Sequence, residues 1–199
     1  MRTIAVIGAG QMGTGIAQTV AANGMKVMLS DVDLAHAEAG KANVEKALAK
    51  LMGRGKIEAA DAEALLARIT PVADYAPMSE ADLIIEAATE REAVKNAIFE
   101  AAGKVLSAEA IMASNTSSIP ITRMANHSPD PARFIGLHFF NPVPVMGLIE
   151  VIPGLATSPA TTDRVTAFAR GLGKEVVLSQ DEPGFVVNRI LLPMINEAV

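Results

Sequence analysis

The feature that most constrains the fold is a glycine-rich turn of the form G-x-G-x-x-G, with Gly8, Gly10 and Gly13 at its fixed positions. It directly follows a short apolar run, Ile4–Ile7, and opens a helical pattern over Met12–Asn23. In such a unit the first glycine allows a tight turn, the second lets the backbone approach a pyrophosphate, and the third lets the helix pack closely on the strand. The first N–H groups of the helix then face the phosphates. The predicted dinucleotide contacts are Gly8, Gly10, Gln11, Met12 and Gly13.

An acidic residue stands where such a unit requires one. A second apolar run, Lys26–Ser30, leads into Asp31, which lies near the offset of ~20 residues expected for the acid that binds the ribose hydroxyls. A carboxylate at that place also repels a 2′-phosphate, which favours NAD over NADP. The alternative is that Asp31 only caps the next helix, although Asp33 is equally suited to that role. FAD is an alternative occupant that no other feature favours.

Apolar runs and helical patterns alternate along the rest of the chain. The predicted strands are Ile4–Ile7, Lys26–Ser30, Asp82–Ala87, Ala110–Ala113, Phe134–Leu137, Gly147–Ile152 and Glu175–Leu178. The predicted helices cover residues 12–23, 33–52, 61–68, 90–102 and 160–171. Strands that are joined through helices pair in parallel with right-handed crossovers. We therefore predict an α/β fold, a Rossmann-type doubly wound and mostly parallel sheet.

The last segment differs in composition from what precedes it. After Pro183 and Gly184, residues 185–199 form a strongly apolar helical pattern. Too little chain surrounds its apolar side chains to bury them, namely those of Phe185, Ile190, Leu191, Met194 and Ile195. We expect a dinucleotide-binding domain over residues 1–182. Over residues 183–199 we expect the first helix of an all-helical domain, in a chain that is truncated.

Composition narrows the classes of function. Half of the residues are hydrophobic, and the net charge of −5 gives no general attraction to nucleic acid or to anionic lipid. The absence of cysteine excludes disulfides, thiolate metal sites and a cysteine nucleophile. His36 and His127 lack the spacing of metal ligands, so we expect no metal. Without a membrane-length apolar run or a signal-peptide pattern, we expect a cytoplasmic protein with no membrane partner.

Two apolar runs each carry one ionisable residue. His138 interrupts the run that begins at Phe134, and Glu150 lies between Ile149 and Val151. Burying a lone carboxylate is costly, so His138 is its natural partner. A histidine with a carboxylate behind it suits general acid–base catalysis, because the carboxylate fixes the tautomer and stabilises the imidazolium. The alternatives are a structural ion pair, or a Glu150 that faces solvent from an edge strand.

A run of small polar residues, Ser114–Ser118, follows the strand predicted at Ala110–Ala113. Ligands of doubly wound sheets bind at the carboxyl ends of the strands, so this run is a candidate binding segment. The alternative is helix capping, because Ser117 or Ser118 before Pro120 is a usual start signal.

Four segments together resemble the L-3-hydroxyacyl-CoA dehydrogenases of short acyl chains, including the bacterial 3-hydroxybutyryl-CoA dehydrogenases. They are residues 7–13, 113–118, 136–143 and 183–189, and the resemblance extends over the whole chain. It implies reversible oxidation of the 3-hydroxyl group of an acyl-CoA by NAD, in fatty acid and butanoate metabolism. It also implies a homodimer formed through the helical domain.

The resemblance assigns roles to individual residues. It makes His138 the catalytic acid–base and Glu150 its paired acid. Ser117 matches the serine that hydrogen-bonds the substrate oxygen, and Asn188 matches the asparagine that helps hold the acyl group. Besides Asp31 and the glycine turn, it implies NAD contacts at Glu90, Lys95 and Asn115.

Basic residues at the end of the second predicted helix are candidates for the CoA phosphates. They are Lys50, Arg54 and Lys56, and the alternative is a solvated basic helix end. Two other functions remain open from sequence. One is a non-catalytic NAD-binding or structural protein, like the lens crystallin relatives of the family. The other is a different hydroxyacid dehydrogenase of the same fold, such as a gulonate-type enzyme.

Overall fold

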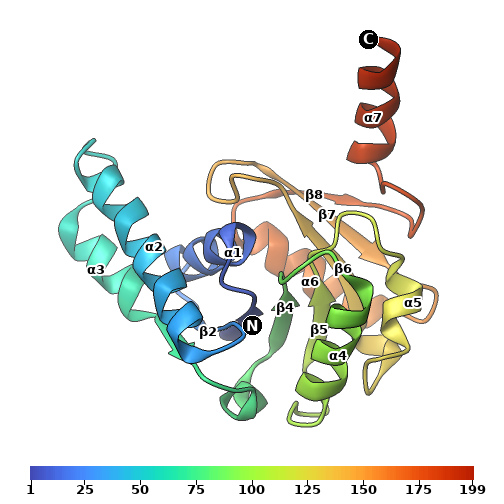
Figure 1. Cartoon of the computed structure of the whole chain (residues 1–199), viewed down its shortest axis with the longest axis horizontal. Helices are drawn as coiled ribbons and strands as arrows, with labels where there is room; N and C mark the ends of the chain where they lie inside the picture. The colour runs from blue at the N-terminus through green and yellow to red at the C-terminus, as the bar shows by residue number, and fades with distance from the viewer.

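The computed structural model describes all 199 residues and contains one eight-stranded sheet of order β3-β2-β1-β4-β5-β6-β7-β8 (Figure 1). The strands are β1 Thr3–Ile7, β2 Lys26–Ser30, β3 Ile69–Val72, β4 Leu83–Glu86, β5 Ile111–Ser114, β6 Phe134–Phe139, β7 Leu148–Pro153 and β8 Glu175–Leu178. The prediction of a Rossmann-type, mostly parallel sheet is confirmed. The predictions omitted β3, whose Pro71 weakens the strand pattern but is tolerated because β3 is an edge strand.

Helices cover both faces of the sheet. They are α1 Gln11–Ala22, α2 Leu34–Met52, α3 Ala59–Ala67, α4 Glu92–Gly103, α5 Ile121–Ala125, α6 Pro159–Gly171 and α7 Val187–Glu197, with 3₁₀ turns η1 Ala76–Glu80 and η2 Pro131–Arg133. None of these helices combines the length and the apolar character that crossing a lipid bilayer demands.

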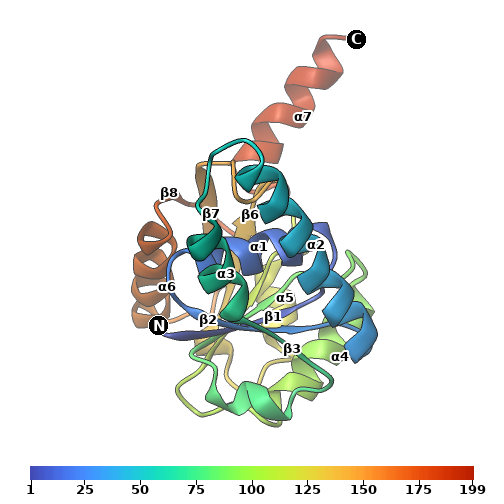
Figure 2. The same cartoon turned by 90° about the vertical axis from the view of Figure 1, so that its left-hand side faces the viewer.

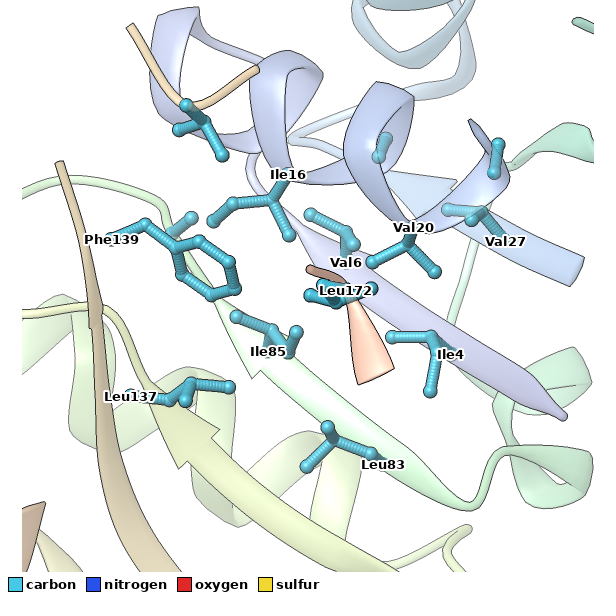
Figure 3. Close-up of a cluster of buried hydrophobic side chains, with 14 of the residues drawn as sticks. Ile4, Val6, Ile16, Val20, Val27, Leu83, Ile85, Leu137, Phe139 and Leu172 are labelled. Atoms are coloured by element: carbon cyan, nitrogen blue, oxygen red, sulfur yellow. The ribbon is translucent and has the colours of Figure 1, made fainter. Parts of the chain in front are cut away.

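The alternation of side chains along the strands divides the core into two layers. Ile4 and Val6 of β1 face α1, α2, α3 and α6, and Figure 3 shows this layer around Ile16 and Phe139. Ala5 and its neighbours on the opposite face pack against α4, α5 and η1. The central strands are buried on both faces, which explains why their sequences are mostly apolar runs, as expected for parallel strands.

One strand pair is antiparallel. β6 and β7 pair so that His138 lies opposite Glu150, whereas every other neighbouring pair in the sheet is parallel. Only residues 140–147 connect these two strands, and a parallel crossover needs a dozen residues or more. The short connection therefore forces the reversal, which brings two side chains from neighbouring strands face to face.

The C-terminal helix α7 projects away from the sheet, as Figures 1 and 2 show from two directions. Four of the five apolar residues expected to be uncovered are exposed, namely Ile190, Leu191, Met194 and Ile195. The expectation is wrong for Phe185, which is 3% exposed. Gly184 and Phe185 both have positive φ, so the chain turns before α7 begins and the Phe185 ring packs back into the domain.

Candidate functional site

The glycine turn has the geometry of a phosphate cradle. A Cβ on Gly8 would lie 2.5 Å from the carbonyl oxygen of Ala87, and one on Gly13 would lie 1.7 Å from that of Gly8. These two glycines are therefore required by packing. Gly10 differs, because nothing lies within 4 Å of its Cβ position and it leads into α1 without a side-chain cap. The open space and the uncapped N–H groups fit a pyrophosphate.

Asp31 is held by backbone at the end of β2. Its carboxylate accepts hydrogen bonds from the N–H groups of Ala9 and Val32, at 2.5 and 2.7 Å. Asp33, not Asp31, caps α2 by accepting from His36 N–H, so the capping alternative for Asp31 is wrong. Asp31 lines a cavity of about 410 Å³ that also contains Gly10 and Tyr75. An adenosine ribose bound there would meet the remaining lone pairs of the carboxylate.

A second cavity, of about 570 Å³, begins at the glycine turn and extends to the carboxyl ends of β4, β5 and β6. It gathers residues that are far apart in the sequence. The sequence-predicted members of its lining are Gly10, Gln11, Met12, Glu90, Lys95, Asn115, Ser117, His138 and Asn188. The remaining members are Ala87, Ala88, Phe139, Phe140 and Asn141. We call this the main cavity.

His138 and Glu150 form a buried pair at the wall of the main cavity. The distance from His138 Nδ1 to Glu150 Oε2 is 2.7 Å, and the two residues are 6% and 0% exposed. A Glu150 that faces solvent is therefore excluded. Burial opposes ionisation of Glu150, but hydrogen bonds from His138 and from the N–H groups of Val187 and Val186 hold the pKa of its carboxyl below the usual value. Because Nδ1 is engaged, Nε2 is the imidazole nitrogen left for a ligand.

The second oxygen of Glu150 fixes the beginning of α7. Oε1 accepts hydrogen bonds from the N–H groups of Val186 and Val187, at 2.9 and 2.8 Å. A carboxylate at a helix N-terminus is also favoured by the helix dipole. This contact brings Asn188 to the main cavity, where its side-chain amide donates to the carbonyl oxygen of Ser117 at 3.4 Å. Phe185 lies beside the His138 ring, with 5.8 Å between the ring centroids.

Glu90 organises the polar run after β5. One of its oxygens accepts hydrogen bonds from the hydroxyls of Thr116, Ser117 and Ser118 and from the N–H of Ser117. Burial again opposes ionisation, yet these bonds and Lys95 lower the pKa of the Glu90 carboxyl. Glu90 therefore supports residues 114–118, which we call the serine turn, and it also lines the main cavity.

No serine caps α5, so the capping alternative for Ser117 and Ser118 is wrong. Asp181 takes that role instead, because its two oxygens accept from the N–H groups of Ile121 and Thr122 at 2.8 and 2.7 Å. The serine hydroxyls are consequently not consumed by the helix. Asn115 is anchored separately, since its side-chain oxygen accepts from Phe139 N–H at 2.8 Å.

Sequence reasoning missed Glu86, a fully buried carboxylate at the end of β4. Both of its oxygens lie 2.8 Å from the Lys95 ammonium, and Lys95 is only 1% exposed. The signal that singled out Glu150, one acid inside an apolar run, was also present here in Leu83–Glu86.

The three basic residues at the α2–α3 connection are not brought to the main cavity. Lys50, Arg54 and Lys56 are exposed near the tip formed by the end of α2 and the start of α3 (Figure 1), and none of them lines either cavity. Both interpretations of these residues, CoA contacts and a solvated helix end, therefore remain predictions.

Comparison with known proteins gives a consistent result. Residues 3–182 match the family described as 3-hydroxyacyl-CoA dehydrogenase, NAD binding domain. The chain is 48% identical over 194 residues to a probable 3-hydroxybutyryl-CoA dehydrogenase of Deinococcus radiodurans, covering 98% of this chain and 69% of that protein. It is 40% identical to 3-hydroxyadipyl-CoA dehydrogenase of Escherichia coli, over 100% of this chain and 42% of that protein. The solved structure of (S)-3-hydroxybutyryl-CoA dehydrogenase from Ralstonia eutropha superposes with a TM-score of 0.97 at 45% identity, covering 100% of this chain and 70% of that one.

Proposed function

This chain belongs to the 3-hydroxyacyl-CoA dehydrogenase family, and on that premise we propose that it uses NAD to interconvert a 3-hydroxyacyl-CoA and a 3-ketoacyl-CoA. The observation that carries the proposal is the buried His138–Glu150 pair in the cavity that the glycine turn opens. The four-carbon substrate named for several relatives, 3-hydroxybutyryl-CoA, is the first to test.

The proposed cofactor placement follows the two cavities. Asp31 receives the adenosine ribose, and the turn from Gly10 to Met12 receives the pyrophosphate. The nicotinamide half then enters the main cavity, where Asn115 and Glu90 are the nearest predicted contacts. When bound there, NAD supplies the acceptor for the hydride that leaves the carbinol carbon.

In the direction of oxidation, His138 Nε2 takes the proton of the substrate hydroxyl. Glu150 holds the opposite edge of the ring, so that the resulting imidazolium has a counter-charge 2.7 Å away. In reduction, the same nitrogen returns the proton to the oxygen of the keto group. The aromatic rings of Phe140 and Phe185, with centroids 4.5 and 5.8 Å from that of the imidazole, restrict its orientation.

Ser117 and Asn188 are placed to hold the substrate. They line the main cavity and are joined through the Asn188 amide and the Ser117 carbonyl. We assign the Ser117 hydroxyl to the reacting oxygen and Asn188 to the acyl group. The Ser117 hydroxyl donates to Glu90 at 3.2 Å. It can turn from Glu90 to donate to the reacting oxygen, whose own proton goes to His138.

We further propose that residues 1–182 are the dinucleotide-binding domain and that residues 183–199 begin a helical unit. The support is the exposed apolar surface of α7, which stands clear of the sheet (Figure 2). Such a surface indicates a protein partner, and a homodimer contact through a helical unit would supply one.

The test combines binding with turnover. NAD and NADH are titrated by calorimetry, and NADH oxidation is then followed with acetoacetyl-CoA, with longer 3-ketoacyl-CoA esters and with free 3-keto acids. The proposal predicts NAD binding and oxidation of NADH by a CoA ester. Turnover of free keto acids alone would indicate a different hydroxyacid dehydrogenase. Binding of NAD with no turnover of either class would indicate a non-catalytic relative.

A further inference from the structure

Glu86 occupies a central place in the sheet, although the proposed reaction gives it no task. It is the last residue of β4, in register with Ile7 of β1 on one side and with Ser114 of β5 on the other. It therefore lies at the same carboxyl edge as the glycine turn and the serine turn. Glu86 is 0% exposed and does not itself line the main cavity.

Every hydrogen-bonding direction of the Glu86 carboxylate is used. Oε1 accepts from Ala88 N–H and from the Lys95 ammonium, and Oε2 accepts from the same ammonium and from the Ser114 hydroxyl. All four distances are 2.8 Å. The carboxylate is thus bonded on all sides within the protein, and the Lys95 ammonium is the partner shared by both of its oxygens.

Lys95 joins this carboxylate to a second one. Its ammonium lies 3.5 Å from Glu90 Oε2, and both Lys95 and Glu90 line the main cavity. The Glu86–Lys95–Glu90 cluster thus contains two carboxylates and one ammonium, and carries one net negative charge. His138 is the other ionisable group in the cavity wall, and its counter-charge Glu150 lies behind it.

The cluster borders the main cavity, which in the proposed reaction also holds the hydride acceptor. In the proposed reaction the proton leaves the hydroxyl oxygen toward His138 while the hydride leaves the adjacent carbon. The nicotinamide ring must therefore lie in the main cavity as well. That ring carries one positive charge in NAD⁺ and none in NADH, and in a partly buried site a nearby negative charge distinguishes the two.

We propose that the net negative charge of the Glu86–Lys95–Glu90 cluster strengthens binding of the oxidised dinucleotide relative to the reduced one, and that Glu86 supplies the charge that Lys95 does not balance. Without the Glu86 charge, Lys95 and Glu90 would be a neutral pair. This inference rests on the proposed NAD site and adds a specificity determinant to it. Glu86 acts through the cluster and is a positioning residue, not a catalytic one.

The test measures the ratio of the dissociation constants for NADH and NAD⁺ in a set of variants of the 199-residue chain. Glu86→Gln and Glu90→Gln each bring the cluster to zero net charge. Each should weaken NAD⁺ relative to NADH by roughly tenfold, the order of effect of one charge in a partly buried site. The double variant Glu86→Gln/Lys95→Met restores one net negative charge and should restore the ratio. As a control, Glu100→Gln removes an exposed carboxylate from α4, the helix that carries Lys95, and it should leave the ratio unchanged.

A purely structural role for Glu86 would weaken both dinucleotides equally and leave the ratio constant, which would overturn the inference. If Glu86→Gln does not fold, the comparison of Glu90→Gln with the double variant tests the inference. The double variant replaces both members of the buried Glu86–Lys95 ion pair, and such a replacement is often tolerated. Equal ratios of the NADH and NAD⁺ dissociation constants in those two variants would overturn the inference. Wild-type protein that binds neither dinucleotide would overturn the proposed function itself, whereas wild-type binding with invariant ratios would overturn only this inference.

Discussion

Glu150 holds His138 with one carboxylate oxygen and the start of α7 with the other. The bond to His138 Nδ1 is 2.7 Å, and the bonds to Val186 and Val187 N–H are 2.9 and 2.8 Å. One side chain therefore orients the proposed acid–base and also places the helix that carries Asn188. Changes at Glu150 should separate these two tasks.

Glu150→Gln and Glu150→Ala should differ in kind. Glutamine keeps an oxygen that can accept from the α7 N–H groups, but it gives the imidazolium no counter-charge, so kcat should fall with little change in KM for acetoacetyl-CoA. Alanine also releases α7, and misplacing a positioning group such as Asn188 can cost a further ~10²-fold. The measurements are steady-state kinetics and hydrogen exchange of residues 186–190. Identical kinetics and exchange in both variants would contradict the double role.

Acid should destabilise the wild type through Glu150. The pKa of this carboxyl is depressed from its usual 4.5 in the folded state, so its contribution to stability is present above about 4.5 and is lost as the pH falls through the folded value. Urea unfolding at neutral pH and at about pH 3.5 should show a larger loss in wild type than in Glu150→Gln. Glu90 and other carboxyls titrate in both proteins, so the difference between the two isolates Glu150. Parallel pH profiles would show that the pair contributes no pH-dependent stability.

Asp31 should determine the choice between NAD and NADP. Replacing it with serine and Val32 with arginine removes the carboxylate that would repel a 2′-phosphate and adds a cation. Val32 is suited to this because it is 82% exposed at the edge of the Asp31 cavity. Fluorescence titration should show weaker NAD and stronger NADP binding. Asp33→Asn is the control, since it keeps the cap of α2 and lies outside that cavity. An unchanged preference would restrict Asp31 to holding the turn through Ala9.

Local signals sufficed for much of the fold and for several members of the site. The spacing of Gly8, Gly10 and Gly13 predicts the turn, and the close contact that requires Gly13 is with Gly8 itself, although the one that requires Gly8 is with the distant Ala87. His138 and Glu150 stood out because each is polar inside an apolar run, and the β6–β7 register that joins them follows from a short connection. Each of these signals lies in residues that are close together in the sequence, so a sequence pattern can reveal it.

The remainder depends on contacts between distant segments. Asp181 caps α5 across 60 residues, and no pattern near either end indicates it. The apolar helical pattern over residues 185–199 includes Phe185 and therefore predicts that its ring is uncovered. In the structure the chain turns at Gly184 and Phe185, and the ring lies beside His138. Lys95 is predicted to contact NAD and does line the main cavity, but its bond to the buried Glu86 was not predicted. Which distant residues meet depends on the order of the strands in the sheet and on the paths of the connecting loops.

The most direct test of the account is single-turnover reduction of acetoacetyl-CoA by protein-bound NADH, in the wild type and in His138→Gln. A positioned general acid typically contributes ~10²–10⁴-fold, so the variant should be slower by at least ~10²-fold while binding NADH with unchanged affinity. Phe140→Leu, which trims a ring beside the imidazole, serves as a control for altered packing and should be affected much less. A His138→Gln rate within about tenfold of wild type would contradict the assignment of proton transfer to His138.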